Sequence, residues 1–78
     1  MFEDKFRAAR RASDMTLEDA GSCCGVTRVT YQQRETAPGD FRLSELRSLY
    51  EEMTQTARPI LADAVGFFIC GDDYVKRN

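Results

Sequence analysis

Residues 16–35 have the sequence TLEDAGSCCGVTRVTYQQRE, and this stretch decides the fold because it predicts two short helices joined by a Gly-Val-Thr turn. Thr16 is a typical N-cap, since its hydroxyl can accept a hydrogen bond from a free backbone N–H. Gly25 can end the first helix with a positive φ. Thr27 can cap the second helix, which we expect to continue to about Glu35.

Three further helices are predicted outside this pair. Residues 2–13 place their apolar side chains on one stripe, and residues 43–53 are clearly amphipathic. The apolar face of the 43–53 helix comprises Leu43, Leu46, Leu49, Tyr50 and Met53. Residues 59–70 begin with a proline and precede Gly71, which favours a helix with a defined start and end.

Residues 65–69 could instead form a strand, because they include β-branched and aromatic side chains and Gly66 weakens a helix. We favour the helix, since the apolar spacing agrees with the proline and glycine at its two ends. The side chains expected in the core are Phe2, Phe6, Leu46, Leu49, Ile60, Leu61 and Val65.

A chain of 78 residues with 42% hydrophobic and 31% charged side chains predicts one globular domain. We expect it to be all-α, to span residues 1–71 and to be followed by a flexible tail over residues 72–78. No apolar run approaches the roughly 20 residues that a membrane helix needs, and the start, MFEDKF, has no apolar signal segment. A cytoplasmic location without membrane contact is therefore expected.

The sequence indicates neither a cofactor site nor an enzyme. The three cysteines are odd in number and include the adjacent pair Cys23 and Cys24, and the chain has no histidine and no C-x-x-C pair. A metal site is therefore not expected, and the cysteines are interpreted as small buried hydrophobic residues. A serine or cysteine nucleophile would lack its usual base, no glycine-rich phosphate loop is present, and no small-molecule substrate is evident.

The net charge of −2 counts mildly against a nucleic-acid partner, but the local charge of a docking surface matters more. Residues 26–34 contain two arginines, Arg28 and Arg34, and no acid. Most of the acids lie elsewhere, notably in residues 40–52. The chain can therefore be acidic as a whole and basic at one surface.

Residues 6–53 resemble, without a gap, the phage repressor and Cro type of helix-turn-helix domain, also called the XRE type. Thr16 stands at the cap of that family's second helix, and residues 25–27 match its turn. Tyr31 stands at the apolar anchor of the recognition helix. Leu17 departs from a glutamine that often touches phosphate in the family, and Arg34 departs from Trp or Leu. The resemblance implies a five-helix lambda-repressor-like fold and a sequence-specific transcriptional regulator of phage or prophage origin that binds double-stranded DNA.

The resemblance also assigns site residues on and around the 27–35 helix. The candidates for base contacts in the major groove are Arg28, Val29, Gln32 and Gln33. The candidates for phosphate contacts are Thr16, Thr27, Arg42 and Arg47. An ion pair between Arg10 and Glu35 is implied, because the family pairs an arginine with an acid at these positions. The alternative to the DNA contacts is a solvated polar surface. The alternative to the ion pair is two unconnected surface charges.

The last helix is a candidate dimer contact. Its apolar residues cover an arc of about 200°, wider than one buried face needs. The residues assigned to a homodimer contact are Ile60, Leu61, Phe67, Phe68 and Ile69. The alternative is that all of them belong to the core. A second class of function also stays open, namely a helix-turn-helix protein-interaction module, antitoxin-like or adaptor, that binds little DNA.

Overall fold

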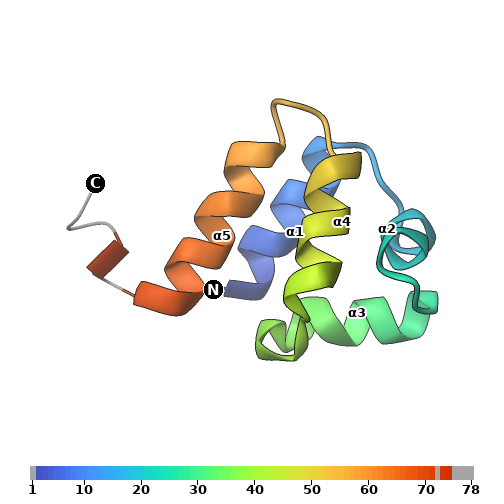
Figure 1. Ribbon diagram of the computed structural model, residues 1–78, viewed down its shortest axis with the longest axis horizontal. Helices are drawn as coiled ribbons and strands as arrows, with labels where there is room; N and C mark the ends of the chain where they lie inside the picture. The colour runs from blue at the N-terminus through green and yellow to red at the C-terminus, as the bar shows by residue number, and fades with distance from the viewer. Residues whose placement is uncertain (1, 72, 75–78) are drawn as a thin grey trace.

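The chain forms five α-helices and one short 3-10 helix in the computed structural model, which describes residues 2–71, 73 and 74 (Figure 1). In chain order the elements are α1 (Phe2–Ala12), α2 (Leu17–Cys24), α3 (Arg28–Thr36), η1 (Pro38–Asp40), α4 (Leu43–Glu52) and α5 (Arg58–Cys70). The described residues include no strand, so the prediction of an all-α domain with five helices is confirmed, and the alternative strand at 65–69 is wrong. None of these helices is long and apolar enough to cross a lipid bilayer.

The caps around the central turn form as the side-chain chemistry predicts. The Thr16 hydroxyl accepts a hydrogen bond from the backbone N–H of Asp19 at 3.0 Å, which caps α2. Gly25 ends α2 with φ of 73°, in the left-handed region that favours glycine. The Thr27 hydroxyl accepts a hydrogen bond from the backbone N–H of Thr30 at 3.2 Å and so caps α3.

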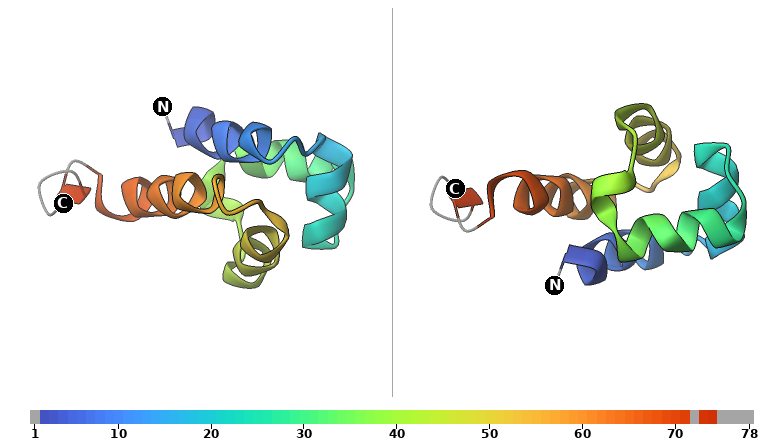
Figure 2. Two further views of the ribbon diagram at one scale, coloured as in Figure 1. Left: turned by 90° about the horizontal axis from the view of Figure 1, so that it is seen from above. Right: turned by 90° about the horizontal axis from the view of Figure 1, so that it is seen from below.

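The arrangement of the helices places α3 on an outer face. The helix α1 packs against α5 and α3, while α2 packs against α3 and α4. Figure 1 shows α2 and α3 at one end of the molecule and the last turns of α5 at the other. In the view from below in Figure 2, α3 lies across the face nearest the viewer, and Figure 1 shows α1 rising at a steep angle to it.

All five α-helices contribute side chains to the core. Tyr31, Leu49 and Leu61 are the largest fully buried side chains. The ring of Phe41, just after η1, stacks on Phe6 with the centroids 5.3 Å apart and meets the Tyr31 ring edge-on at 5.9 Å. Of the other expected core residues, Phe6 is buried, and Leu46, Ile60 and Val65 are half-buried against this cluster. The side chain of Phe2 lies outside the described part of the chain.

Two residues of the predicted apolar face of α4 are exposed, which corrects that prediction. Leu43 is 81% exposed and Tyr50 is 42% exposed. Leu43 is the first residue of α4, and at about 100° per residue it lies about 120° around the helix from the buried Leu49. Leu46 and Met53 lie closer to the direction of Leu49 and pack against the core. The buried face of α4 is thus narrower than the sequence pattern predicts.

The apolar arc of α5 divides into buried and exposed parts. Leu61 is 2% exposed and belongs to the core of its own chain, so its assignment to a dimer contact is wrong. Phe67 is half-buried, with the Lys5 ammonium 4.3 Å from its ring centre. Phe68 and Ile69 are 43% and 72% exposed. An apolar surface therefore remains at the end of α5.

Tyr74 belongs to the stretch expected to form a flexible tail, and its side chain contacts α5. Its hydroxyl donates a hydrogen bond to the Asp63 carboxylate at 2.6 Å, and its ring centre lies 5.0 Å from that of Phe67. A Cβ atom at Gly66 would overlap the Tyr74 ring, so a glycine at this position lets the ring lie directly on α5. The rest of that expectation concerns residues 72 and 75–78, which lie outside the described residues.

Candidate nucleic-acid interface

The exposed side of α3 carries the four residues predicted to contact bases. Arg28, Gln32 and Gln33 are exposed, and Val29 is 58% exposed. They occupy adjacent positions on the helix surface, since residues three and four apart lie on one side. This set contains no acidic residue, and the helix that carries it lies at the outer face of the molecule in the view from below (Figure 2).

The opposite side of α3 is anchored in the core. Tyr31 is fully buried and Glu35 is 5% exposed. Burial, with the Glu35 carboxylate as the next cause, raises the pKa of the Tyr31 phenol well above its usual value. The Tyr31 hydroxyl oxygen has no hydrogen-bond partner of good geometry within the described residues. Hydrophobic packing, rather than a hydrogen bond of this tyrosine, holds the middle of α3.

Arg10 and Glu35 form the ion pair that the family resemblance implies. The Arg10 Nε atom donates to Glu35 Oε2 at 2.6 Å, and Nη2 donates to Oε1 at 3.5 Å. The Arg10 Nη1 atom also donates to the carbonyl oxygen of Met15 at 3.0 Å. One guanidinium therefore fixes the end of α1 both to α3 and to the segment that enters α2.

A second ion pair, which the sequence interpretation missed, joins α3 to α4. Arg34 donates from Nε and Nη2 to the two carboxylate oxygens of Glu45, at 3.2 and 3.3 Å. Glu45 Oε1 also accepts a hydrogen bond from the backbone N–H of Arg42 at 3.0 Å and so caps the start of α4. A signal was present, because an arginine stood at a position that is usually apolar in the resembling family.

The local electrostatics of Glu45 favour its ionised form. Burial acts to raise the pKa of this carboxyl group, but the hydrogen bonds from the Arg34 side chain and the Arg42 backbone outweigh it. The net effect is a pKa below the usual value of 4.5. Glu45 therefore stays charged at neutral pH, and the link between α3 and α4 stays intact.

The two threonines predicted to contact phosphate form hydrogen bonds within the chain at the starts of α2 and α3. The backbone N–H of Thr16 donates to the Asp19 carboxylate at 3.0 Å. The Thr27 hydroxyl donates to the Thr30 hydroxyl at 3.0 Å. Both side chains are exposed, and Thr27 lies next to the outward side of α3.

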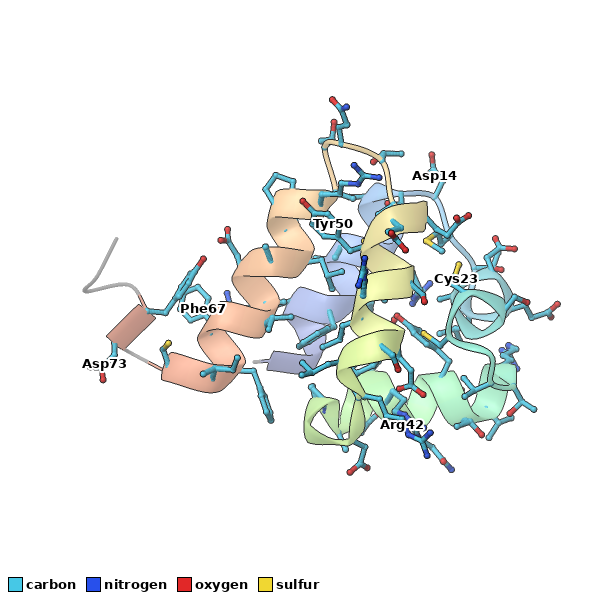
Figure 3. All side chains as sticks on the ribbon, in the orientation of Figure 1. Asp14, Cys23, Arg42, Tyr50, Phe67 and Asp73 are labelled. Atoms are coloured by element: carbon cyan, nitrogen blue, oxygen red, sulfur yellow. The ribbon has the colours of Figure 1, made fainter. Side chains whose placement is uncertain are left out.

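The two arginines predicted to contact phosphate lie at different distances from α3. Arg42 is exposed at the start of α4, and Figure 3 shows it at the lower edge of the molecule, where α3 runs. Arg47 is also exposed, but it lies five residues further along α4, a rise of about 7 Å. Because α4 runs away from α3 in Figure 1, the structure brings Arg42 to this surface and leaves Arg47 more remote.

Two acidic side chains of α4 lie at another part of the surface. An open hollow of about 430 Å³ between α2 and α4 is lined by Cys23, Glu51 and Glu52, together with two serines. Burial, followed by the charges of Glu52 and Asp19, raises the pKa of the Cys23 thiol. Cys23 lies well above Arg42 in Figure 3. Two of the exposed acids, Glu51 and Glu52, therefore lie at a different part of the surface from Arg42.

The described residues contain no cluster of three or more histidine, cysteine or acidic side chains placed to hold a metal ion. The thiol of Cys24 contacts the Glu45 backbone oxygen at 3.8 Å, and burial raises its pKa to about 11. A thiol with that pKa stays protonated at neutral pH and is a weak nucleophile.

Comparisons with protein-family models, with curated proteins and with solved structures find no match to this chain.

Proposed function

We propose that this protein is a cytoplasmic, sequence-specific DNA-binding transcriptional regulator that inserts α3 into the major groove. The observation that carries the proposal is the two-sided character of α3. Its outward side is polar, exposed and free of acids, while its inward side is fixed by Tyr31 and by two ion pairs. A helix held on one side and open on the other suits major-groove docking, because the groove is wide enough for one helix.

The exposed side chains have the chemistry to distinguish bases. The Arg28 guanidinium can donate two hydrogen bonds to O6 and N7 of guanine. The amides of Gln32 and Gln33 can pair with N6 and N7 of adenine, and Val29 can contact a thymine methyl group. Thr27 and Arg42 flank this set and are the better placed of the four proposed phosphate contacts.

We also propose that the regulator is a homodimer with the end of α5 at its two-fold axis. Phe68, Ile69 and Leu43 are exposed around an apolar hollow of about 150 Å³ whose floor includes Phe41 and Val65. An isologous contact would cover this surface on both copies. Dimers of this kind read two half-sites about one turn of DNA apart, which fits a chain with one reading helix.

A helix-turn-helix module that binds another protein is the second candidate. The same apolar hollow favours it, since exposed surfaces of this type also mark contacts with other proteins. The two candidates differ in what the outward side of α3 does. DNA recognition requires Arg28 and Gln33, whereas protein binding through Phe68 and Ile69 does not.

Selection from a random double-stranded DNA library tests the main proposal. We expect one enriched sequence, and we expect Arg28→Ala or Gln33→Ala to weaken its binding by about 1–3 kcal/mol and to relax the preference at one base pair. Arg28→Lys keeps the charge but loses the paired donors, so it should retain affinity for unrelated DNA and lose the preference.

Gln55→Ala is the matched control for Gln33→Ala. Gln55 is exposed in the loop between α4 and α5, at the top of Figure 1 and remote from α3. Its replacement should leave affinity and preference unchanged. If no sequence is enriched, or if Arg28→Ala binds the selected sequence as well as the parent does, DNA recognition by α3 is wrong.

A further inference from the structure

A basic hollow lies between α1 and α3, beside the outward side of α3. Its volume is about 150 Å³. It is lined by side chains of α1, α3 and the start of α2, namely Arg7, Arg10, Arg11, Leu17, Gln32, Glu35 and Thr36. Arg10 and Glu35 neutralise each other, and Arg11 adds an exposed positive charge at the rim. The hollow therefore carries net positive charge in a chain whose overall charge is −2.

Exposed side chains of α1 and α3 form part of the rim of the hollow. Arg7 and Arg11 are exposed and four residues apart, so they lie on the same side of α1. Gln32 and Thr36 are likewise exposed and four residues apart on α3, and the Thr36 hydroxyl donates to the Gln32 carbonyl oxygen at 3.2 Å. Both pairs line the same hollow, which brings them together although α1 rises at a steep angle to α3 in Figure 1.

We propose that this hollow binds a backbone phosphate of the DNA strand that borders the major groove, with Arg11 as the principal contact. The inference rests on the proposed docking of α3 in that groove. The groove is about 12 Å wide, and a helix with its side chains is about 10–12 Å across, so a docked helix has a phosphate backbone on each side.

Different arginines lie along the two flanks of α3, where the two phosphate backbones would run. The start of α4, with Arg42, lies on one side, and α1, with Arg11, lies on the other. A guanidinium presents paired donors that fit phosphate oxygens, and neutral Gln32 can add a further donor from α3. The hollow thus adds a phosphate contact from α1. None of the predicted phosphate contacts, Thr16, Thr27, Arg42 and Arg47, belongs to that helix.

The test compares Arg11→Gln with the parent on the selected DNA sequence and on a scrambled sequence over a range of salt concentrations. Loss of one phosphate contact should reduce the slope of log affinity against log salt by about 0.9. Between about 50 and 200 mM salt, the parent should therefore lose about 3.5-fold more affinity than the variant. The loss at low salt should be equal on both sequences, because a phosphate carries no base identity.

Two further variants separate this contact from general effects of charge and folding. Lys5→Gln removes the same charge from the same helix. Lys5 lies over the Phe67 ring and does not line the hollow, so this variant should keep the salt dependence of the parent. Arg11→Lys retains a charge and should restore most of the slope. Far-UV circular dichroism establishes that each variant is folded.

The outcomes distinguish this inference from the proposal on which it rests. If Arg11→Gln keeps the parent slope while Arg28→Ala loses its base preference, the phosphate site is wrong and the docking of α3 stands. If Lys5→Gln lowers the slope as much as Arg11→Gln, the effect is one of total charge and the site is wrong. If the parent itself binds no DNA, both proposals fail together.

Discussion

Replacing Glu35 with alanine removes the carboxylate that neutralises Arg10 inside the fold. The two side chains are only 6% and 11% exposed, and the shortest contact between them is 2.6 Å. Removing one partner of such a pair leaves a poorly solvated charge and typically costs about 3–5 kcal/mol. A chain of 78 residues has a total stability of about 4–12 kcal/mol. We therefore expect Glu35→Ala to remove a large fraction of the stability.

The reciprocal change, Arg10→Ala, should cost at least as much. It leaves Glu35 uncompensated and also removes the hydrogen bond to the Met15 carbonyl oxygen at 3.0 Å. The double variant leaves no orphan charge, so its loss should be smaller than the sum of the two single losses, by roughly 0.5–3 kcal/mol. Urea unfolding at neutral pH, followed by far-UV circular dichroism, gives the three free energies.

A strictly additive result would refute this reasoning. If the two single variants each lose less than about 1 kcal/mol and their losses add, the pair behaves as an exposed surface ion pair. The same conclusion would follow if high salt abolished the effect, because a buried pair is screened much less than an exposed one.

Three other changes test separate features of the structure. Tyr31→Phe removes a buried hydroxyl without a good partner, so unfolding should show unchanged or higher stability, by up to about 1 kcal/mol; a loss of that size would reveal a hydrogen bond to Glu35. The pKa of Glu45 is lowered in the fold, so its ionisation stabilises the fold above the usual pKa of 4.5, and this stabilisation is lost as the pH falls below that value. In an acid titration of the free energy of unfolding, Glu45→Gln should lack this part of the loss, and a curve identical to that of the parent would contradict the prediction. Ile69→Asp should convert a dimer into a monomer in sedimentation at micromolar concentration without unfolding it, since Ile69 is 72% exposed; a parent that sediments as a monomer rules out the dimer.

The helix boundaries could be predicted closely because helix capping depends on neighbours in the chain. A threonine at the start and a glycine at the end act on backbone groups within four residues, so Thr16, Gly25 and Thr27 carry that information locally. The buried face of α3 was predictable in part, since Tyr31 is the one large apolar side chain on its inward side. These features do not require knowledge of how distant segments meet.

The features that escaped prediction depend on such distant contacts. Arg34 and Glu45 are eleven residues apart in different helices, and neither position shows an amphipathic pattern that reveals the other. Tyr74 covers Gly66 only because the chain turns back after α5. Leu43 fits the apolar pattern of α4 but lies on its first turn, where no facing helix covers it. Periodicity predicts which side of a helix is apolar, not how much of that side is covered.

The net charge of a small protein says little about whether one of its surfaces can approach DNA. Here two glutamates, Glu35 and Glu45, are turned inward and neutralised by arginines of α1 and α3, so they contribute little field outside. Other acids, including Glu51 and Glu52, surround the hollow between α2 and α4. The arginines at positions 11 and 28 remain exposed beside the outward side of α3. Exposed charges are screened beyond about 10 Å at moderate salt. The positive charge of these two arginines, rather than the net charge of −2, therefore governs whether DNA can approach α3.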